Sequence, residues 1–230
     1  MNVDIQLAVI DLAGTSVADD GLVEAAFVEA VGRLGVGPDS DRLPEMMAEV
    51  RRTMGASKIS VFRSLFGDDR LAHEANLAFE QAYADMIAQG LCQPLPGAED
   101  TFRQLRQRGV KVALTTGFAP ATRNALLAKL GWDDLIDLAL SPIDAGRGRP
   151  YPDLILTALL RLGVTHVRAV ATLGDTANDI RAGLAAGAGI VLGVLTGAHD
   201  RPTLDGAGAD AVLTDISGLV PFLAHSSLTT

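Results

Sequence analysis

Short apolar runs alternate with helix patterns through most of the chain, and this alternation limits the possible folds more than any other feature. The apolar runs cover residues 7–10, 110–116, 135–140, 168–173, 189–195 and 211–213. Residues 99–108, 120–130, 153–162, 177–186 and 216–223 have the apolar spacing of helices. Strands that alternate with helices form a parallel sheet with helices on both faces. We therefore expect an α/β protein built on a doubly wound parallel sheet.

The stretch after the first apolar run has a different pattern. No strand pattern occurs between residues 16 and 90, and helix patterns cover residues 22–34, 43–54, 58–65 and 71–88. A breaker with two prolines and a glycine, at residues 93–97, closes this stretch. We predict two parts: residues 1–16 and 95–230 form a Rossmann-like core domain, and residues 17–94 form an inserted, all-helical cap domain.

Polar residues stand where the predicted strands end or in the loops that follow them. They are Asp11, Thr115, Thr116, Arg149, Asp175 and Asp179. Because the carboxyl ends of parallel strands meet at one edge, where open α/β sheets bind ligands, we expect these side chains to converge. Each also has an ordinary structural alternative. Asp and Thr cap helices and start turns, and an arginine before a proline is usually a solvated loop residue.

Three of these residues are carboxylates that could form a metal site. Asp11 and Asp175 could hold Mg²⁺, a hard ion that takes oxygen ligands, and Asp179, one helical turn past Asp175, could support that shell. The net charge of −9 argues against nucleic acid and anionic membranes as partners. A phosphate-handling site in such a chain needs a metal ion or a local cluster of positive charge.

The other polar residues suit a phosphoryl group. Thr115, Thr116 and Arg149 could bind phosphate oxygens. Asp11 could then attack phosphorus and form an aspartyl-phosphate. The sequence thus predicts phosphoryl transfer at the carboxyl edge of the sheet.

The remaining composition bears on the compartment. The single cysteine, Cys92, is interpreted as a small apolar filler and fits a reducing environment. Residues 1–4 lack the basic and apolar regions of a signal peptide. We expect a cytoplasmic protein that does not associate with membranes.

The order of Asp11, Thr115, Arg149 and the Gly-Asp-x-x-x-Asp pattern at residues 174–179 resembles the haloacid dehalogenase superfamily of phosphotransferases. The helical insertion is similar to the mobile cap of that superfamily, and the resemblance covers nearly the whole chain. It implies a Mg²⁺-dependent reaction in which Asp11 is the nucleophile.

Two departures from the superfamily pattern resemble one group within it, the phosphonatases. Ala13 stands where a second aspartate usually protonates the leaving group, and Arg149 stands where a lysine is usual. The segment at residues 54–59, Met-Gly-Ala-Ser-Lys-Ile, is similar to the phosphonatase cap segment whose lysine forms a Schiff base. The resemblance implies that Lys58 is this lysine and that Ala13 offers its backbone carbonyl to Mg²⁺. Phe118 stands where those enzymes have tyrosine.

Lys58 is one of only three lysines, against sixteen arginines. Most lysines are solvated, but a C–P bond needs an electron sink next to its leaving carbon, and only an amine can form the required imine. Val61 occupies the place of a phosphonatase histidine. The four histidines, His73, His166, His199 and His225, all lie outside the motifs.

Three functions remain open on the sequence. The first is a phosphonatase-like hydrolase that cleaves phosphonoacetaldehyde or a related small carbonyl phosphonate. The second is a phosphate monoesterase for a small organic or sugar phosphate, in which Lys58 only binds substrate. The third is a non-catalytic binder of phosphate ligands, against which the retained Asp11 argues.

The apolar helix expected at residues 22–34 also allows a homodimer through the cap.

Overall fold

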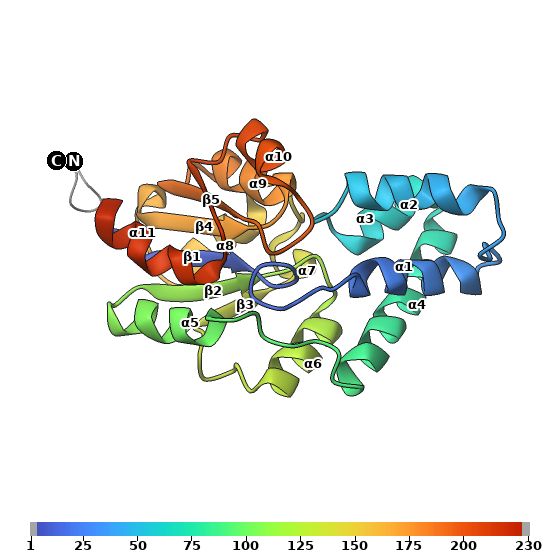
Figure 1. The fold of residues 1–230 in the computed structure, drawn as a ribbon, viewed down its shortest axis with the longest axis horizontal. Coiled ribbons are helices and arrows are strands. Elements are labelled where there is room, and N and C mark those ends of the chain that lie inside the picture. The colour runs from blue at the N-terminus through green and yellow to red at the C-terminus, as the bar shows by residue number, and fades with distance from the viewer. Residues whose placement is uncertain (1–3, 227–230) are drawn as a thin grey trace.

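The computed structural model describes residues 4–226 and contains one parallel sheet of six strands in the order β3-β2-β1-β4-β5-β6 (Figure 1). The strands are β1 (Leu7–Asp11), β2 (Lys111–Thr115), β3 (Leu138–Leu140), β4 (Val170–Gly174), β5 (Ile190–Val194) and β6 (Ala211–Leu213). All neighbouring strands pair in parallel. This arrangement confirms the predicted α/β fold with a doubly wound parallel sheet.

Side chains of β1 alternate between the two faces of the sheet. Ala8 and Ile10 join the apolar layer beneath α5 (Ala98–Gln107), α6 (Pro120–Leu130) and α11 (Leu219–Ser226). Leu7 and Val9 join the layer beneath α8 (Asp153–Arg161), α9 (Ala177–Ala186) and α10 (Arg201–Gly206). Because both faces are covered, the strand is apolar throughout instead of alternating in polarity.

Some predicted boundaries differ from the structure. The strand expected at 168–173 begins only at Val170, because Val167–Ala169 form a turn of 3-10 helix. The helix expected at 216–223 starts in the same way, with a 3-10 turn at Ile216–Gly218. The short helices α7 (Pro142–Ala145) and α10 were not expected. Both are brief and contain proline near their first residue, so they lack a long apolar pattern.

Four helices follow β1 and lie together to one side of the sheet (Figure 1). They are α1 (Leu22–Arg33), α2 (Arg42–Arg52), α3 (Lys58–Phe66) and α4 (Asp69–Ala88). The ring of Phe27 on α1 lies 4.8 Å, centroid to centroid, from both Phe62 on α3 and Phe79 on α4. These buried rings hold the helices on one another.

The chain enters and leaves this helical part along two adjacent segments. Ala18 N donates to Gln93 O over 2.9 Å, and Leu95 N donates to Ser16 O over 2.9 Å. Because the two connections are paired at this point, we propose the boundary of a cap domain here, with residues 17–94 in the cap and residues 1–16 and 95–230 in the core.

The segment at residues 54–58 lies directly against loops of the core. Asn178 Nδ2 donates to Met54 O over 2.8 Å, and Lys58 N donates to Gly117 O over 3.3 Å. At Gly55, which has φ of 84°, an added Cβ would lie 2.3 Å from Thr176 Oγ1. Glycine is therefore required for this close approach, and the helical segment packs directly against the core in this structure.

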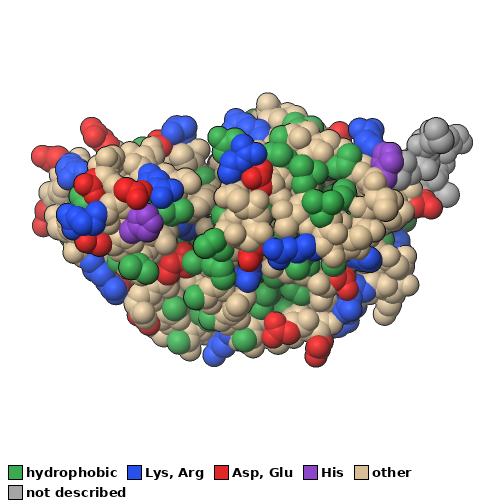
Figure 2. All heavy atoms as spheres, turned by 180° about the vertical axis from the view of Figure 1, so that it is seen from behind, with side chains coloured by type: hydrophobic (Ala, Val, Ile, Leu, Met, Phe, Trp, Pro, Cys, Tyr) green, Lys and Arg blue, Asp and Glu red, His purple; other side chains and the backbone are tan. Residues whose placement is uncertain are grey.

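Charged side chains of both signs are interspersed over the helical half of the molecule, as Figure 2 shows for one face. Several form ion pairs across or along the cap helices, such as Arg51 with Glu24 and Arg70 with Glu74. These exposed pairs contribute little stability individually. Between residues 4 and 226, no helix combines the length and apolarity needed to cross a membrane.

Candidate active site

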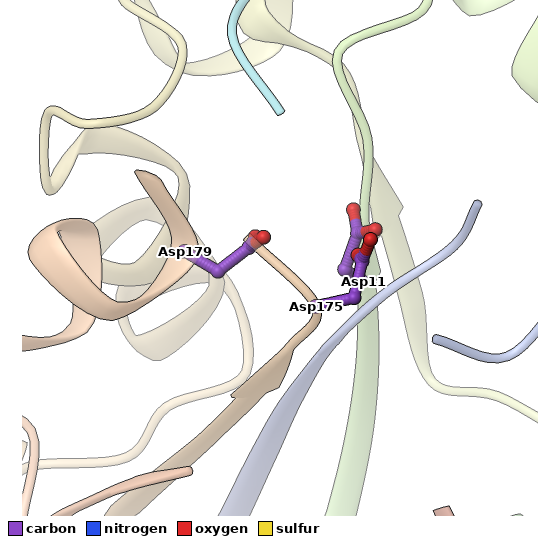
Figure 3. Close-up of side chains that lie close together, drawn as sticks. All are labelled: Asp11, Asp175 and Asp179. Atoms are coloured by element: carbon purple, nitrogen blue, oxygen red, sulfur yellow. The ribbon is translucent and has the colours of Figure 1, made fainter. Parts of the chain in front are cut away.

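Three buried carboxylates meet at the carboxyl edge of the central strands. Asp11 ends β1, Asp175 follows β4, and Asp179 lies in the first turn of α9. One oxygen of each lies within 4.8 Å of an oxygen of the others, and no more than 8% of any of the three residues is exposed. Figure 3 shows Asp11 and Asp175 close together and Asp179 pointing toward them from its helix. The structure thus brings together the acids that the sequence predicted to converge.

Arg149 lies among these carboxylates. Its Nη1 is 2.5 Å from Asp11 Oδ1 and also donates to Asp179 Oδ1. Burial alone would lower the pKa of Arg149, but the charges of Asp11 and Asp179 outweigh burial and raise it. Its Nε is buried and has no hydrogen-bond partner among the described residues. A buried cation with a spare donor is suited to an anionic group with several oxygens.

Asp175 and Asp179 are each held in place by several bonds. Asp175 accepts from Thr15 Oγ1 over 3.1 Å and from Ala198 N over 2.8 Å. Asp179 Oδ2 accepts from the backbone N–H of Thr176 over 3.1 Å and from the Thr176 hydroxyl, as part of the capping box of α9. Its Oδ1 faces Arg149, so Asp179 also fixes the position of that guanidinium.

The negative charge at this edge exceeds the positive charge. Burial raises the pKa of Asp11 well above its usual range, although Arg149 opposes the shift. Burial, together with the nearby Asp179, raises the pKa of Asp175 to about 6. Buried carboxyl groups with raised pKa values lose their protons more readily when a divalent cation is bound between them. Mg²⁺, which prefers oxygen ligands, fits this site because its charge would offset the repulsion between the carboxylates. We propose that Asp11, Asp175 and the backbone carbonyl of Ala13 hold this ion.

The raised pKa of Asp175 gives a test of the metal site by thermal denaturation. A group whose pKa is higher in the folded state stabilises the fold at low pH and loses that contribution as the pH rises through the folded-state value. We therefore expect the Tm of metal-free protein to fall by about 5 °C between about pH 4.5 and 7.5. Mg²⁺ should restore it at the higher pH and have little effect at the lower. Asp175→Asn should reduce the pH-dependent fall, leaving the contribution of Asp11, and should remove most of the Mg²⁺ response. An equal Mg²⁺ response in this variant would exclude Asp175 as a ligand.

Lys58 begins α3 at the closed face of the cap and is only 6% exposed. Its Nζ lies 5.6, 5.7 and 5.4 Å from the ring centroids of Phe27, Phe79 and Phe118. Within residues 4–226 this amine makes no hydrogen bond or ion pair that would occupy it. Burial lowers the pKa of Lys58 to about 8, although nearby carboxylates, chiefly Asp19, oppose the shift. A desolvated amine of this kind has an increased neutral, nucleophilic fraction near neutral pH.

One cavity connects Lys58 with the carboxylate site. Its lining includes Asp11, Ala13, Thr116, Arg149 and Asp175 from the core and Asp19, Val23, Met54, Gly55 and Lys58 from the expected cap. The cavity has a volume of about 30 Å³, which leaves room for only a few water molecules. A phosphate or phosphonate group is larger than this space, so we expect the helical segment or Arg149 to move if such a group enters.

The two threonines at the end of β2 do not face the same space. Thr116 lines the cavity that contains Asp11. Thr115 instead lines a separate small cavity behind Arg149, together with Thr172 and Asp179. Successive side chains along a strand point to opposite faces of the sheet. Two adjacent threonines in a sequence therefore do not show which of them faces the site. We keep the proposal of phosphate binding for Thr116 and Arg149.

Several residues around the site were not anticipated. Phe27 and Phe79 come from separate cap helices, and apolar residues at helical spacing give no sign that they surround an amine. Glu80 on α4 accepts from Ala119 N over 3.0 Å and from the Thr122 hydroxyl, and thereby joins the cap to α6. Such contacts depend on how the cap helices pack against the core, which no local sequence pattern predicts.

Comparisons with known proteins place this geometry in a family. A family model described as haloacid dehalogenase-like hydrolase matches residues 5–187. Phosphonoacetaldehyde hydrolase of Bacillus cereus is 28% identical over 210 residues, covering 82% of this chain and 76% of that protein. The structure of a phosphonoacetaldehyde hydrolase-like protein from Oleispira antarctica aligns with a TM-score of 0.82 at 24% identity, covering 99% of this chain and 96% of the other. A hydrolase structure from Pseudomonas syringae aligns with a TM-score of 0.83 at 26% identity, covering 96% and 98%.

Proposed function

The chain belongs to the haloacid dehalogenase-like hydrolases, and on that premise we propose that it is a Mg²⁺-dependent phosphonatase. Its substrate is phosphonoacetaldehyde or a related small carbonyl phosphonate. The supporting observation is the amine of Lys58, which is buried, makes no hydrogen bond or ion pair with the described residues, and lines the same cavity as Asp11. A relative named phosphonoacetaldehyde hydrolase, 28% identical to this chain, supports the same substrate class.

The core residues carry out the phosphoryl half of the reaction. Arg149 and Thr116 bind the phosphonate oxygens, and the donors of Arg149 that now face Asp11 turn to the substrate. Asp11 Oδ1, released from that contact, attacks phosphorus and forms an aspartyl-phosphate, which water later hydrolyses. Asp11, Asp175 and the Ala13 carbonyl would hold Mg²⁺, whose charge would offset the negative charges of the carboxylates and the phosphonate.

Lys58 prepares the carbon side of the bond. Its neutral amine condenses with the substrate carbonyl and takes up one proton to give an iminium ion and one molecule of water. When Asp11 attacks, the electron pair of the C–P bond moves into the iminium, and the carbon leaves as an enamine. Protonation of the enamine and hydrolysis release the aldehyde and the lysine. No acid at position 13 is needed, because the leaving atom is carbon and its charge is taken up by the imine.

A phosphate monoesterase is the second candidate. It is supported by the clustering of Asp11, Arg149 and Asp175, which would transfer a phosphoryl group without the help of Lys58. Release of phosphate from phosphonoacetaldehyde and from an aryl phosphate, each with Mg²⁺, distinguishes the two. Rapid release from the phosphonate supports our proposal, whereas release only from the ester supports the alternative. Release from neither supports a non-catalytic binder.

The lowered pKa of Lys58 gives a second test, by reductive methylation with formaldehyde and cyanoborohydride. A pKa of about 8 leaves roughly a tenth of the amine neutral at pH 7, about two-hundredfold more than for a free lysine. We expect methylation of the peptide that carries Lys58 to reach half its maximal rate near pH 8, as measured by mass spectrometry. A rate that still increases tenfold per pH unit above pH 9 would contradict a desolvated, activated amine.

A further inference from the structure

Imine formation requires proton transfers that no histidine of this site can perform. No histidine among residues 4–226 lines the cavity of Lys58. Val61, at the expected histidine position, is buried in the apolar core of the cap. His199 directly follows Ala198, which lines the cavity, but its Nδ1 accepts a hydrogen bond from Ala177 N over 2.9 Å. A different group must therefore exchange protons with the amine.

Asp19 shares the cavity of Lys58. It lies in the connection between β1 and α1 and lines the same cavity as Lys58 and Asp11. Its Oδ1 accepts from Val23 N over 3.0 Å, which fixes the carboxylate at the first turn of α1. No hydrogen bond to its Oδ2 occurs within the described part of the chain, so that oxygen is available in the cavity.

The two other carboxylates close enough to influence Lys58 are already engaged. Asp11 faces Arg149 and serves as the nucleophile of the proposed reaction. Glu80 uses both carboxylate oxygens, one for Ala119 N and the other for the Thr122 hydroxyl. Asp175 also lines the cavity, but it accepts from Thr15 Oγ1 and Ala198 N and is a proposed metal ligand. Asp19 is the remaining acid that the cavity places with the amine.

We propose that Asp19 is the acid–base partner of Lys58, an inference that rests on the proposed phosphonatase function. Asp19 accepts one proton from the Lys58 ammonium through a water molecule in the shared cavity, which frees the amine to attack the carbonyl. After a proton moves from nitrogen to oxygen in the adduct, a carbinolamine remains. Protonated Asp19 then gives its proton to the carbinolamine hydroxyl, which leaves as water. The ammonium and carbonyl thus become an iminium and water, and Asp19 returns to its carboxylate.

The surroundings of the pair favour this exchange. Burial raises the pKa of Asp19 and lowers that of Lys58 to about 8, so the two values approach each other. A smaller difference in pKa makes proton transfer between the groups easier. The other charged groups that influence one or both members are Asp11, Asp20, Glu24, Glu80 and Arg149.

The test compares the variant Asp19→Asn with Asp20→Asn, a change at the exposed neighbouring residue. For each, the measurement is the rate at which borohydride traps the imine that Lys58 forms with phosphonoacetaldehyde. Asparagine keeps an acceptor for Val23 N, so we expect the fold to be retained, which thermal denaturation checks. Trapping and phosphonate cleavage should slow by about 10²–10³-fold in Asp19→Asn and remain unchanged in Asp20→Asn. Equal trapping rates in the two variants would overturn the role of Asp19 and leave the phosphonatase function intact.

A second variant separates proton transfer from mere positioning. Asp19→Ala leaves space in the cavity, and added formate should restore trapping in a concentration-dependent manner, because formate supplies the missing carboxylate. Slow trapping that formate does not improve would show that Asp19 only positions Lys58. Failure of the wild-type protein to be trapped at all would remove the phosphonatase proposal and this inference with it.

Discussion

Replacing Lys58 with arginine is expected to abolish cleavage of phosphonoacetaldehyde while leaving hydrolysis of an aryl phosphate within about tenfold of the wild type. Arginine keeps the positive charge, but its guanidinium cannot form an imine with an aldehyde. Without the imine the C–P electron pair has no acceptor, so we expect a loss of at least about 10³-fold in kcat. Release of phosphate from each substrate measures the two activities in the same assay.

Lys129, which is exposed on the core, provides the matched control. Lys129→Arg makes the same chemical change away from the cavity and should leave both activities unaltered. Retained cleavage of the phosphonate by Lys58→Arg would show that the lysine only binds substrate. An equal loss of both activities would instead indicate that the substitution had disturbed the whole site.

Replacing Asp11 with asparagine is expected to abolish both activities together. Asparagine has the same shape and can still accept a bond from Arg149, which now faces Asp11 Oδ1 at 2.5 Å, so the fold should be preserved. It cannot form the acyl phosphate, and loss of a nucleophile costs about 10⁴-fold or more. Asp39→Asn, at an exposed position before α2, controls for the change itself. If Asp11→Asn retained more than a few per cent of either activity, water would have to attack phosphorus directly.

The fold was largely predictable because its strands are buried on both faces. Runs such as residues 7–10 and 189–195 are apolar throughout, and helices of clear apolar spacing separate the later ones. Their polar ends could be expected to converge because all the strands are parallel, and the structure places Asp11, Asp175 and Asp179 together. The short helix α10 was not predicted because it has only 6 residues, with proline at the second and Asp-Gly at its end, and so has no long apolar pattern.

The surroundings of Lys58 could not be predicted in the same way. Phe27 and Phe79 lie on separate cap helices, and Phe118 lies in the loop between β2 and α6. Their approach to one amine depends on packing between segments far apart in the chain, which local periodicity does not encode. The sequence predicted phosphate binding for both Thr115 and Thr116, and it could not show that the two line different cavities, because one residue of register exchanges the two faces of a strand.

The most direct test is to add borohydride during turnover of phosphonoacetaldehyde by the wild-type protein and locate the reduced adduct by peptide mass spectrometry. The chain has only three lysines, which makes the assignment unambiguous. We expect an ethyl or phosphonoethyl group on Lys58 and on neither Lys111 nor Lys129. Turnover of the phosphonate with no adduct on Lys58 would contradict the imine mechanism.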